Sequence, residues 1–266
     1  KTFYSPKQTI SGFEKEFPSL SKPELLIKEL GLTEFSPFSS VTPKDLKKVH
    51  DGKFVDDTLS LKITNGFYNK SKDIADSLLW TNGSMVAAAK EAFQNRSITF
   101  SPTSGFHHAR YDGSDGYCTF NGLALAAVEL MELGAKVGIL DFDYHRGDGT
   151  EDILNRLSLK KKIIHLTAGQ YFQKGKGELF IKEIPKILNM FQSCDVILYQ
   201  AGADQHIEDP LGGLLTTAQL IERDTLVRDF CIANKIGCAW NLAGGYQEPI
   251  SKVLGIHENT YRIFHR

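Results

Sequence analysis

The sequence predicts an α/β protein with a central, mostly parallel sheet and helices on both faces. Five short runs are almost continuously apolar, which is typical of strands that are covered on both faces. Stretches with helical periodicity lie between the later runs, and strands that alternate with helices favour a parallel sheet. The predicted strands span residues 97–100, 136–143, 162–167, 195–202 and 237–245.

Three helices are predicted among these strands, because apolar residues recur three and four positions apart. They cover residues 121–133, 150–159 and 216–234. Thr150 is expected to cap the second helix, since a threonine hydroxyl can accept a hydrogen bond from the first turn.

The first ninety residues carry weaker signals. Residues 21–31 and 42–61 predict short helices, each opened by a serine or a threonine ahead of a proline. Residues 73–93 predict one or two helices interrupted at Asn82-Gly83. We find no internal repeat or low-complexity linker in the sequence, so we expect one domain over residues 1–266.

The amino-acid composition and net charge indicate which classes of binding partner are to be expected. The 266 residues carry a net charge of −1 and are 41% hydrophobic, which predicts no direct nucleic-acid partner and no membrane partner. The cysteines at 118, 194, 231 and 238 show no CxxC spacing, so we expect reduced thiols and a cytoplasmic location. A removed leader stays open as an alternative, because the chain starts at Lys1.

The stretch DFDYHRGDG, residues 141–149, places acids and a histidine at the end of a predicted buried strand. Side chains two positions apart share a face, so Asp141, Asp143 and His145 should converge. Without a cation they would repel one another or become protonated, and Asp with His suits a divalent metal, zinc above all. Asp204, which follows the strand 195–202, is the expected third ligand. A lone D-x-H pattern is more often a surface feature. Here a further candidate ligand, Asp204, follows a different predicted strand, and this favours a metal site.

His107 and His108 follow the turn-rich segment SPTSG after the first predicted strand. Two adjacent histidines suit a proton-transfer pair, because imidazole titrates near neutral pH and each ring needs an orienting partner. Asp141 and Asp148 are the surplus acids that could orient them. A lone loop histidine is usually exposed and inert, so spacing alone leaves this assignment open.

Five blocks of the sequence together resemble the zinc-dependent histone deacetylase family of the arginase/deacetylase superfamily. These blocks are SPTSGFHHA, SDGYCTFNGLALA, VGILDFDYHRGDGTEDIL, YQAGADQHIEDPLGGLLTT and NLAGGYQ. Their order and approximate spacing match the family from about residue 97 to residue 246. The resemblance implies a three-layer arginase/deacetylase-like fold and a compact member of the bacterial type, without long terminal extensions.

The resemblance implies that Asp143, His145 and Asp204 bind one Zn²⁺ ion. Tyr246 would donate its hydroxyl to the substrate carbonyl opposite the metal and so stabilise an oxyanion. Family members also tend to hold a monovalent cation such as K⁺ by the backbone around residues 141–145, which is a further expectation for this chain.

The same resemblance implies different catalytic roles for His107 and His108. His108 would act as general base toward a zinc-activated water and then as general acid toward the leaving amine. His107 would assist electrostatically. Asp141 would orient His107, and Asp148 would orient His108.

A narrow tunnel for the substrate is also implied by the resemblance. Gly116, Tyr117 and Phe172 would line it and hold the stem of an acylated lysine. The implied substrates are acylated lysine in a protein or peptide, or a small acylated amine.

Three positions depart from the family pattern. Arg146 stands where the family more often has a histidine or a glutamine, and we expect it to point away from the metal. The segment QKGKGE follows Phe172 where the family usually continues with Pro-Gly, so the shape of that loop is open. Ala243 begins the glycine run before Tyr246.

The predicted function is removal of an acyl group, expected to be acetyl, by a zinc-dependent hydrolase of amide bonds. Two alternatives remain. A ureohydrolase-like enzyme with two manganese ions would want further Asp or His ligands for the second metal. A non-catalytic module that binds acyl-lysine would have no need of His108 or Tyr246.

Overall fold

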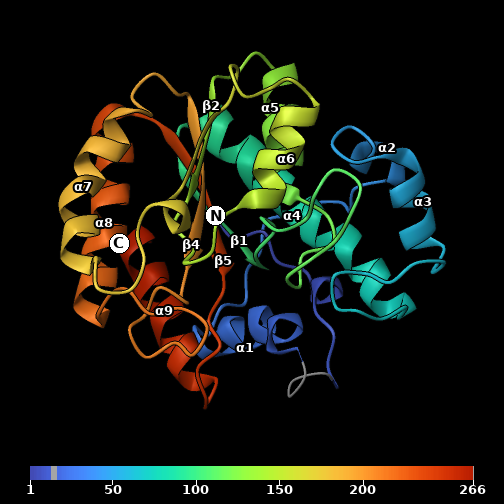
Figure 1. Ribbon diagram of the computed structural model, residues 1–266, viewed down its shortest axis with the longest axis horizontal. Helices are drawn as coiled ribbons and strands as arrows, with labels where there is room; N and C mark the ends of the chain where they lie inside the picture. Colours follow the sequence, from blue (N-terminus) through green and yellow to red (C-terminus); the bar gives the residue numbers. More distant parts are fainter. Residues whose placement is uncertain (13–16, 266) are drawn as a thin grey trace.

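The computed structural model describes residues 1–12 and 17–265 of the chain (Figure 1). The predicted domain, 1–266, includes residues 13–16 and 266, which lie outside the described residues. The α-helices are α1 Lys22–Glu29, α2 Pro43–Leu46, α3 Gly52–Leu59, α4 Lys72–Asn95, α5 Gly122–Glu132, α6 Asp148–Arg156, α7 Gly177–Asn189, α8 Thr217–Asn234 and α9 Ser251–Phe264. The strands are β1 Ile98–Ser104, β2 Val137–Asp141, β3 Ile164–Thr167, β4 Val196–Gly202 and β5 Gly237–Ala243.

Within the described residues, the five strands form one sheet in the order β1-β5-β4-β2-β3, and every neighbouring pair is parallel. The predicted parallel sheet is therefore confirmed. From β2 the chain passes through α6 to β3 on one side, whereas from β4 it passes through α8 to β5 on the other. In open parallel sheets, ligands bind beyond the carboxyl ends of strands where the winding reverses, which here is between β2 and β4.

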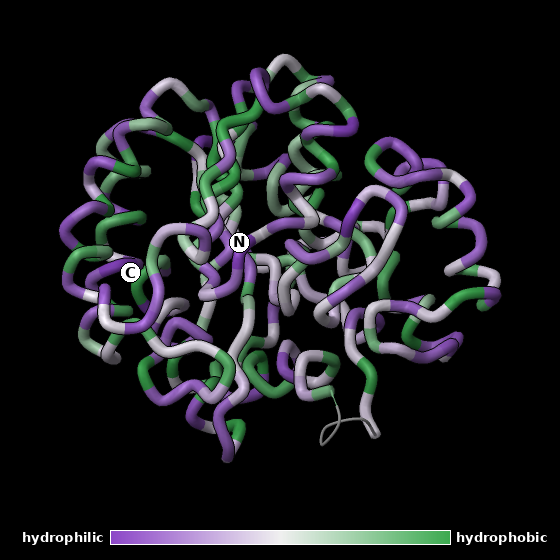
Figure 2. Tube along the Cα trace, in the orientation of Figure 1, coloured by the Kyte–Doolittle hydropathy of each residue, from purple (hydrophilic) through white to green (hydrophobic). Residues whose placement is uncertain are grey.

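Helices cover both faces of the sheet, as predicted. One face packs against α4, α5 and α6, and the other packs against α7, α8 and α9 (Figure 1). Strand β5 contributes side chains to the hydrophobic cores on both faces of the sheet. Ala239 packs in the core under α4, α5 and α6, whereas Cys238 and Trp240 pack in the core under α7, α8 and α9. Along the helices, hydrophobic and hydrophilic residues alternate with the turns, as expected for helices that cover a sheet with one face (Figure 2).

Strand β1 is longer than predicted. Residues 101–104 belong to the strand, whereas the sequence indicated a turn-rich segment there. The proline that suggested a turn, Pro102, lies on an edge strand and within a register shift between Ser101 and Ser104. Proline is tolerated at both kinds of position because its missing N–H leaves no ladder bond unmade there.

The predicted interruption at Asn82-Gly83 is wrong, because α4 runs through it as one helix of 24 residues. Gly83 is explained by packing instead: a Cβ atom there would collide with the backbone carbonyl of Ser39. The region 42–61 forms two helices, and Thr42 caps the first of them in a capping box with Asp45.

The predicted cap at Thr150 is also wrong. Helix α6 begins at Asp148, and the Thr150 hydroxyl instead accepts a hydrogen bond from Asn121 Nδ2 at 3.0 Å. Helices α7 and α9 had no counterpart among the predicted elements. Helix α7 contains Pro185, a residue that usually ends a helix, which weakened its helical signal.

The four cysteines are free thiols, and all are buried. Within residues 1–12 and 17–265, none of the helices combines the length and hydropathy required to cross a lipid bilayer.

Candidate active site

The carboxyl ends of β2 and β4 bring the predicted metal ligands together. Strand β2 ends at Asp141, so Asp143 and His145 lie in the loop that follows it rather than on the strand. The strand alternation used to align them does not extend that far. They converge because the loop turns back on itself, with the His145 N–H donating to Asp143 Oδ1 at 2.9 Å. Asp204 joins them from the loop after β4.

Asp143, His145 and Asp204 form a compact cluster of metal-ligating groups. One candidate ligand atom from each lies within 4.8 Å of the others. His145 Nδ1 lies 3.2 Å from Asp143 Oδ1 and 2.9 Å from Asp204 Oδ2, so one imidazole nitrogen faces both carboxylates. Two carboxylates and one imidazole suit a catalytic zinc, which usually keeps three protein ligands.

The electrostatics of this cluster fit a cation. Burial and the neighbouring Asp143 charge raise the pKa of Asp204 to about 8. Hydrogen bonds to Asp143 and Asp204 raise the pKa of His145 to about 11. Two fully buried carboxylates therefore need a positive charge between them, which a divalent ion supplies.

His107 and Asp141 form a buried pair next to the cluster. His107 Nδ1 lies 2.7 Å from Asp141 Oδ2, and both side chains are almost inaccessible. Burial opposes protonation of His107, but the charges of Asp141, Asp143 and Asp204 outweigh it and raise its pKa to about 9. Gln200 Nε2 also donates to Asp141, at 3.1 Å.

His108 and Asp148 form a second pair that is more exposed. His108 Nδ1 lies 2.9 Å from Asp148 Oδ1. The guanidinium of Arg110 donates to the other oxygen of Asp148. The structure thus brings together both His–Asp pairs that the resemblance implied, and it adds Arg110 to the second pair.

Tyr246 follows a pair of glycines that comes directly after β5. Gly244 and Gly245 have φ angles of 51° and 89°, in the left-handed region where glycine is strongly favoured. Asp209 Oδ2 accepts the Tyr246 backbone N–H at 2.8 Å and so holds the turn. Burial and then the charges of Asp143 and Asp204 raise the pKa of Tyr246 above its usual value, so its hydroxyl remains a donor.

A small cavity opens next to these groups. It is lined by Ser19, Lys22, Ser104, Gly105, His107, His108, Gly116, Tyr117, Cys118, Asp143, His145, Gly244 and Tyr246. Gly116 has a φ angle of 51°, and a Cβ atom there would lie 2.6 Å from His108 Cδ2. Phe172 is not among the described residues that line the cavity; its ring packs against Phe180 at 4.8 Å. The tunnel role of Phe172 stays a prediction.

Lys22 also lies in the wall of this cavity, although it was not among the site residues predicted from the sequence. It is fully buried at the start of α1, and its Nζ donates to the Gly244 carbonyl. Burial lowers its pKa to about 8, against the opposing charges of Asp204, Asp143 and Asp209. A lysine in the first turn of a short helix has no local signature of burial, so the sequence offered no signal.

Arg146 pairs with Glu151 on α6, with Nη2 to Oε2 at 2.5 Å, and its side chain is half exposed. Its place outside the metal-ligating cluster agrees with the orientation predicted for it. The monovalent cation expected near residues 141–145 stays a prediction.

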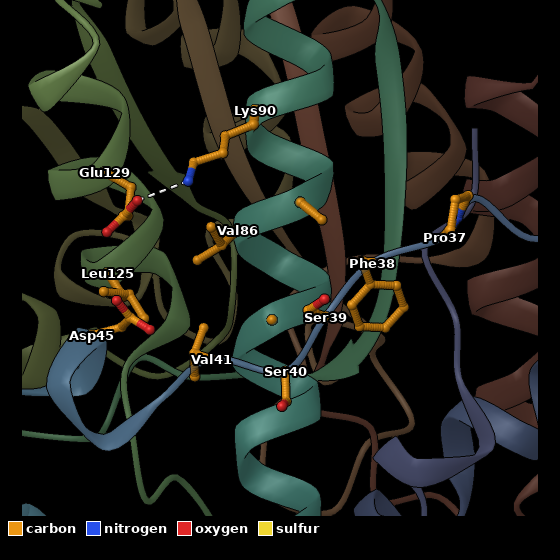
Figure 3. A pocket seen from close by; sticks show the side chains of 12 residues that line it. Pro37, Phe38, Ser39, Ser40, Val41, Asp45, Val86, Lys90, Leu125 and Glu129 are labelled. Atoms are coloured by element: carbon orange, nitrogen blue, oxygen red, sulfur yellow. Dashed lines mark hydrogen bonds and ion pairs between the residues drawn. The ribbon is translucent and has the colours of Figure 1, made fainter.

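A second cavity, of about 280 Å³, lies between residues 37–41, α4 and α5 (Figure 3). Lys90 on α4 reaches toward Glu129 on α5, and Nζ lies 2.8 Å from Oε2. Glu129 also contacts Lys48. The charged groups here neutralise one another, and the described residues that line this cavity include no member of the acid–histidine cluster.

Comparisons with known proteins agree with this geometry. The family model for the histone deacetylase domain matches residues 17–174, more than half of the chain. Probable histone deacetylase 1-B of Xenopus laevis is 29% identical over 162 residues, which are 50% of this chain and 34% of that protein. Histone deacetylase 1 of Homo sapiens is 28% identical over 162 residues, 50% of this chain and 33% of that protein. This chain therefore aligns with about a third of each of these relatives.

An uncharacterized protein of Picosynechococcus sp. is 26% identical over 212 residues, 72% of this chain and 70% of that protein. The crystal structure of the HDA15 HD domain superposes with a TM-score of 0.78, covering 99% of this chain and 88% of that chain. At 18% identity this likeness shows the fold, an α/β arginase-like architecture. The family model, which matches more than half of the chain, establishes that the chain belongs to the histone deacetylase family.

Proposed function

We propose that this chain is a zinc-dependent amidohydrolase that removes an acyl group from the side-chain amine of lysine or of a lysine-like amine. One observation carries the proposal. The cluster of Asp143, His145 and Asp204 lies beside two His–Asp pairs and Tyr246, around a single cavity. Membership of the histone deacetylase family supports the same reaction.

The residues around the cavity can share the chemistry of amide hydrolysis. A zinc ion held by the three ligands would polarise the amide carbonyl and acidify a water molecule. His108 has Nδ1 directed to Asp148, so Nε2 is the nitrogen that takes a proton from the attacking water and returns it to the leaving amine. His107, beside Asp141, adds positive charge near the developing oxyanion, and Tyr246 donates a hydrogen bond to it.

Acetyl is the acyl group to test first, on lysine in a protein or peptide and on small acylated amines. Gly116 and Tyr117 border the cavity and suit a narrow, uncharged stem such as an acylated lysine side chain. A cytoplasmic location and the expectation of no nucleic-acid or membrane partner stay predictions.

The contacts of the neighbouring acids do not favour a site for two manganese ions. Asp141 is engaged by His107 and Gln200, and Asp148 is engaged by His108 and Arg110. Each of these carboxylates already has an orienting task. A non-catalytic binding module has no use for the buried and oriented His107–Asp141 pair.

The test is release of acetate from acetyl-lysine peptides and acetylpolyamines by the purified chain. We expect turnover that is lost on chelation, restored by one equivalent of Zn²⁺ and blocked by a hydroxamate. Asp143→Asn should lose both zinc and turnover, whereas Tyr246→Phe should keep zinc and turn over slowly. Binding of acyl-lysine peptide without turnover by the zinc-loaded protein would support the binding module instead. Two metal ions per chain would support the manganese enzyme.

A further inference from the structure

Arg223 is a fully buried arginine that lies beneath the candidate metal site. It belongs to α8, and its side chain is completely inaccessible to solvent. A buried guanidinium is unfavourable unless nearly all of its donors are satisfied, so its partners show what it does. These partners fall into two groups on opposite sides of the guanidinium.

One side of the guanidinium is neutralised by Asp224. Nε and Nη2 of Arg223 donate to the two carboxylate oxygens at 2.8 and 3.2 Å. Asp224 is itself held by the Tyr199 hydroxyl at 2.5 Å and by Thr260 Oγ1 at 2.7 Å. This side anchors the guanidinium between the sheet and α9 and balances its charge.

The other side of the guanidinium faces the ends of β2 and β4. Nη1 donates to the Gly202 carbonyl at 2.7 Å and to Gln205 Oε1 at 2.9 Å, with the Phe142 carbonyl at 3.4 Å. Phe142 immediately precedes Asp143, and Gln205 immediately follows Asp204. Gly202 is the last residue of β4, and a Cβ atom on it would lie only 2.5 Å from Asp143 Cα.

We propose that Arg223 is a positioning residue for the metal site. By holding Phe142, Gly202 and Gln205 on one guanidinium nitrogen, it sets the distance between the two loops that carry Asp143 and Asp204. It therefore controls the affinity of the site for a divalent cation without touching that cation. This inference rests on the metal site of the proposed function, and it goes beyond the ligands to the helix behind them.

The test is the affinity of the purified full chain for Zn²⁺, measured in competition with a fluorescent chelator, with no substrate present. Arg223→Lys keeps a positive charge beside Asp224 but lacks the planar fork that reaches both sides. We expect its dissociation constant for Zn²⁺ to rise by about tenfold or more, the usual range when a group behind a ligand is lost. The visible spectrum of the Co²⁺-loaded variant should shift, because the ligand geometry changes.

Two control variants separate positioning from ordinary stability. Arg228→Met removes an arginine of the same helix whose Nη1 donates to the Ile263 carbonyl at 3.2 Å, away from both strand ends. Val227→Ala opens a cavity at a buried position of the same helix and lowers the melting temperature. Both should bind Zn²⁺ within about twofold of the wild type, as do substitutions away from a site.

The outcomes are decisive. A Zn²⁺ affinity of Arg223→Lys within about twofold of the wild type, with a loss of stability like that of Val227→Ala, overturns the inference. If Arg223→Lys does not fold, Gln205→Leu removes one acceptor and should weaken Zn²⁺ binding by about three- to tenfold; an unchanged affinity overturns the inference equally. A wild type that binds no Zn²⁺ overturns it as well. A wild type that binds Zn²⁺ but hydrolyses no acylated amine contradicts the proposed function and leaves the role of Arg223 standing.

Discussion

The two His–Asp pairs have the same chemistry and different surroundings. His107 and Asp141 are 4% and 0% exposed, whereas His108 and Asp148 are 23% and 32% exposed. The distances are similar, 2.7 and 2.9 Å, and the two imidazole rings lie 4.1 Å apart. Burial rather than contact distance therefore distinguishes them. The buried pair suits a fixed electrostatic role, and the exposed pair suits proton exchange with a substrate.

The largest expected effect is the loss of turnover on removing the accessible imidazole. His108→Ala should lower kcat/KM by about 10²–10⁴-fold, because proton transfer to and from the substrate is lost. Zinc content should remain that of the wild type, since His108 is not in the metal-ligating cluster. Steady-state kinetics and metal analysis on the same sample check this. A loss of zinc in His108→Ala would mean that the two pairs do not divide their roles in this way.

The next largest effect is a difference in how much Asp141 and Asp148 contribute to the free energy of unfolding. Asp141→Asn should lower the free energy of unfolding by about 3 kcal/mol, because a buried charge pair is broken and Asp141 also accepts from Gln200 and from the Asp143 N–H. Asp148→Asn should lower it by about 1 kcal/mol or less, since that pair is partly exposed. Chemical denaturation of both variants gives the comparison. Equal losses would show that burial does not distinguish the pairs.

The two His–Asp pairs should also lose their contributions to stability at opposite ends of the pH scale. The raised pKa of His107 means that its contribution to stability is complete below pH 6.5 and is lost as the pH rises through about 9. The pKa of Asp148 is lowered from its usual 3.8: burial raises it, but the hydrogen bond to His108 and nearby positive charges outweigh burial. Its contribution is therefore present above pH 3.8 and is lost as the pH falls through the lower folded value.

Melting temperatures of chelator-treated protein across the pH range test these windows. Asp141→Asn should flatten the loss of stability at alkaline pH, and Asp148→Asn should flatten the loss at acidic pH. If Asp141→Asn instead changed the loss of stability at acidic pH, or Asp148→Asn the loss at alkaline pH, the assignment of that loss to its His–Asp pair would be contradicted.

The smallest effect concerns Arg110, which shares Asp148 with His108. Arg110→Met should change kcat/KM by less than about tenfold, because a half-exposed ion pair contributes little. Arg146→Met is the matched control, since the Arg146 side chain pairs with Glu151, and the link to Asp148 runs through the backbone, where the Asp148 N–H donates to the Arg146 carbonyl at 2.8 Å and is kept in the variant. A loss of activity in Arg110→Met as large as that in His108→Ala would place Arg110 in contact with the substrate.

The sequence predicted most of the sheet and most of the site because both leave local signals. Buried parallel strands are continuous apolar runs, and the polar residues that follow them gather at one edge of the sheet. Asp143, His145 and Asp204 were found in this way. The strand β1 was cut short because Pro102 looks like a turn residue, and only its place on a sheet edge shows why it is tolerated.

By itself, the sequence determined the fold class, the family and the candidate ligands, because hydrophobic periodicity and short motifs depend only on residues that are close together in the sequence. Tertiary structure alone decided which His–Asp pair is buried, and it alone placed Lys22 and Arg223. Lys22 bonds to Gly244, 222 residues away, and Arg223 bonds to Phe142, 81 residues away. Contacts across such separations depend on how helices pack on the sheet, and no local pattern of residues encodes them.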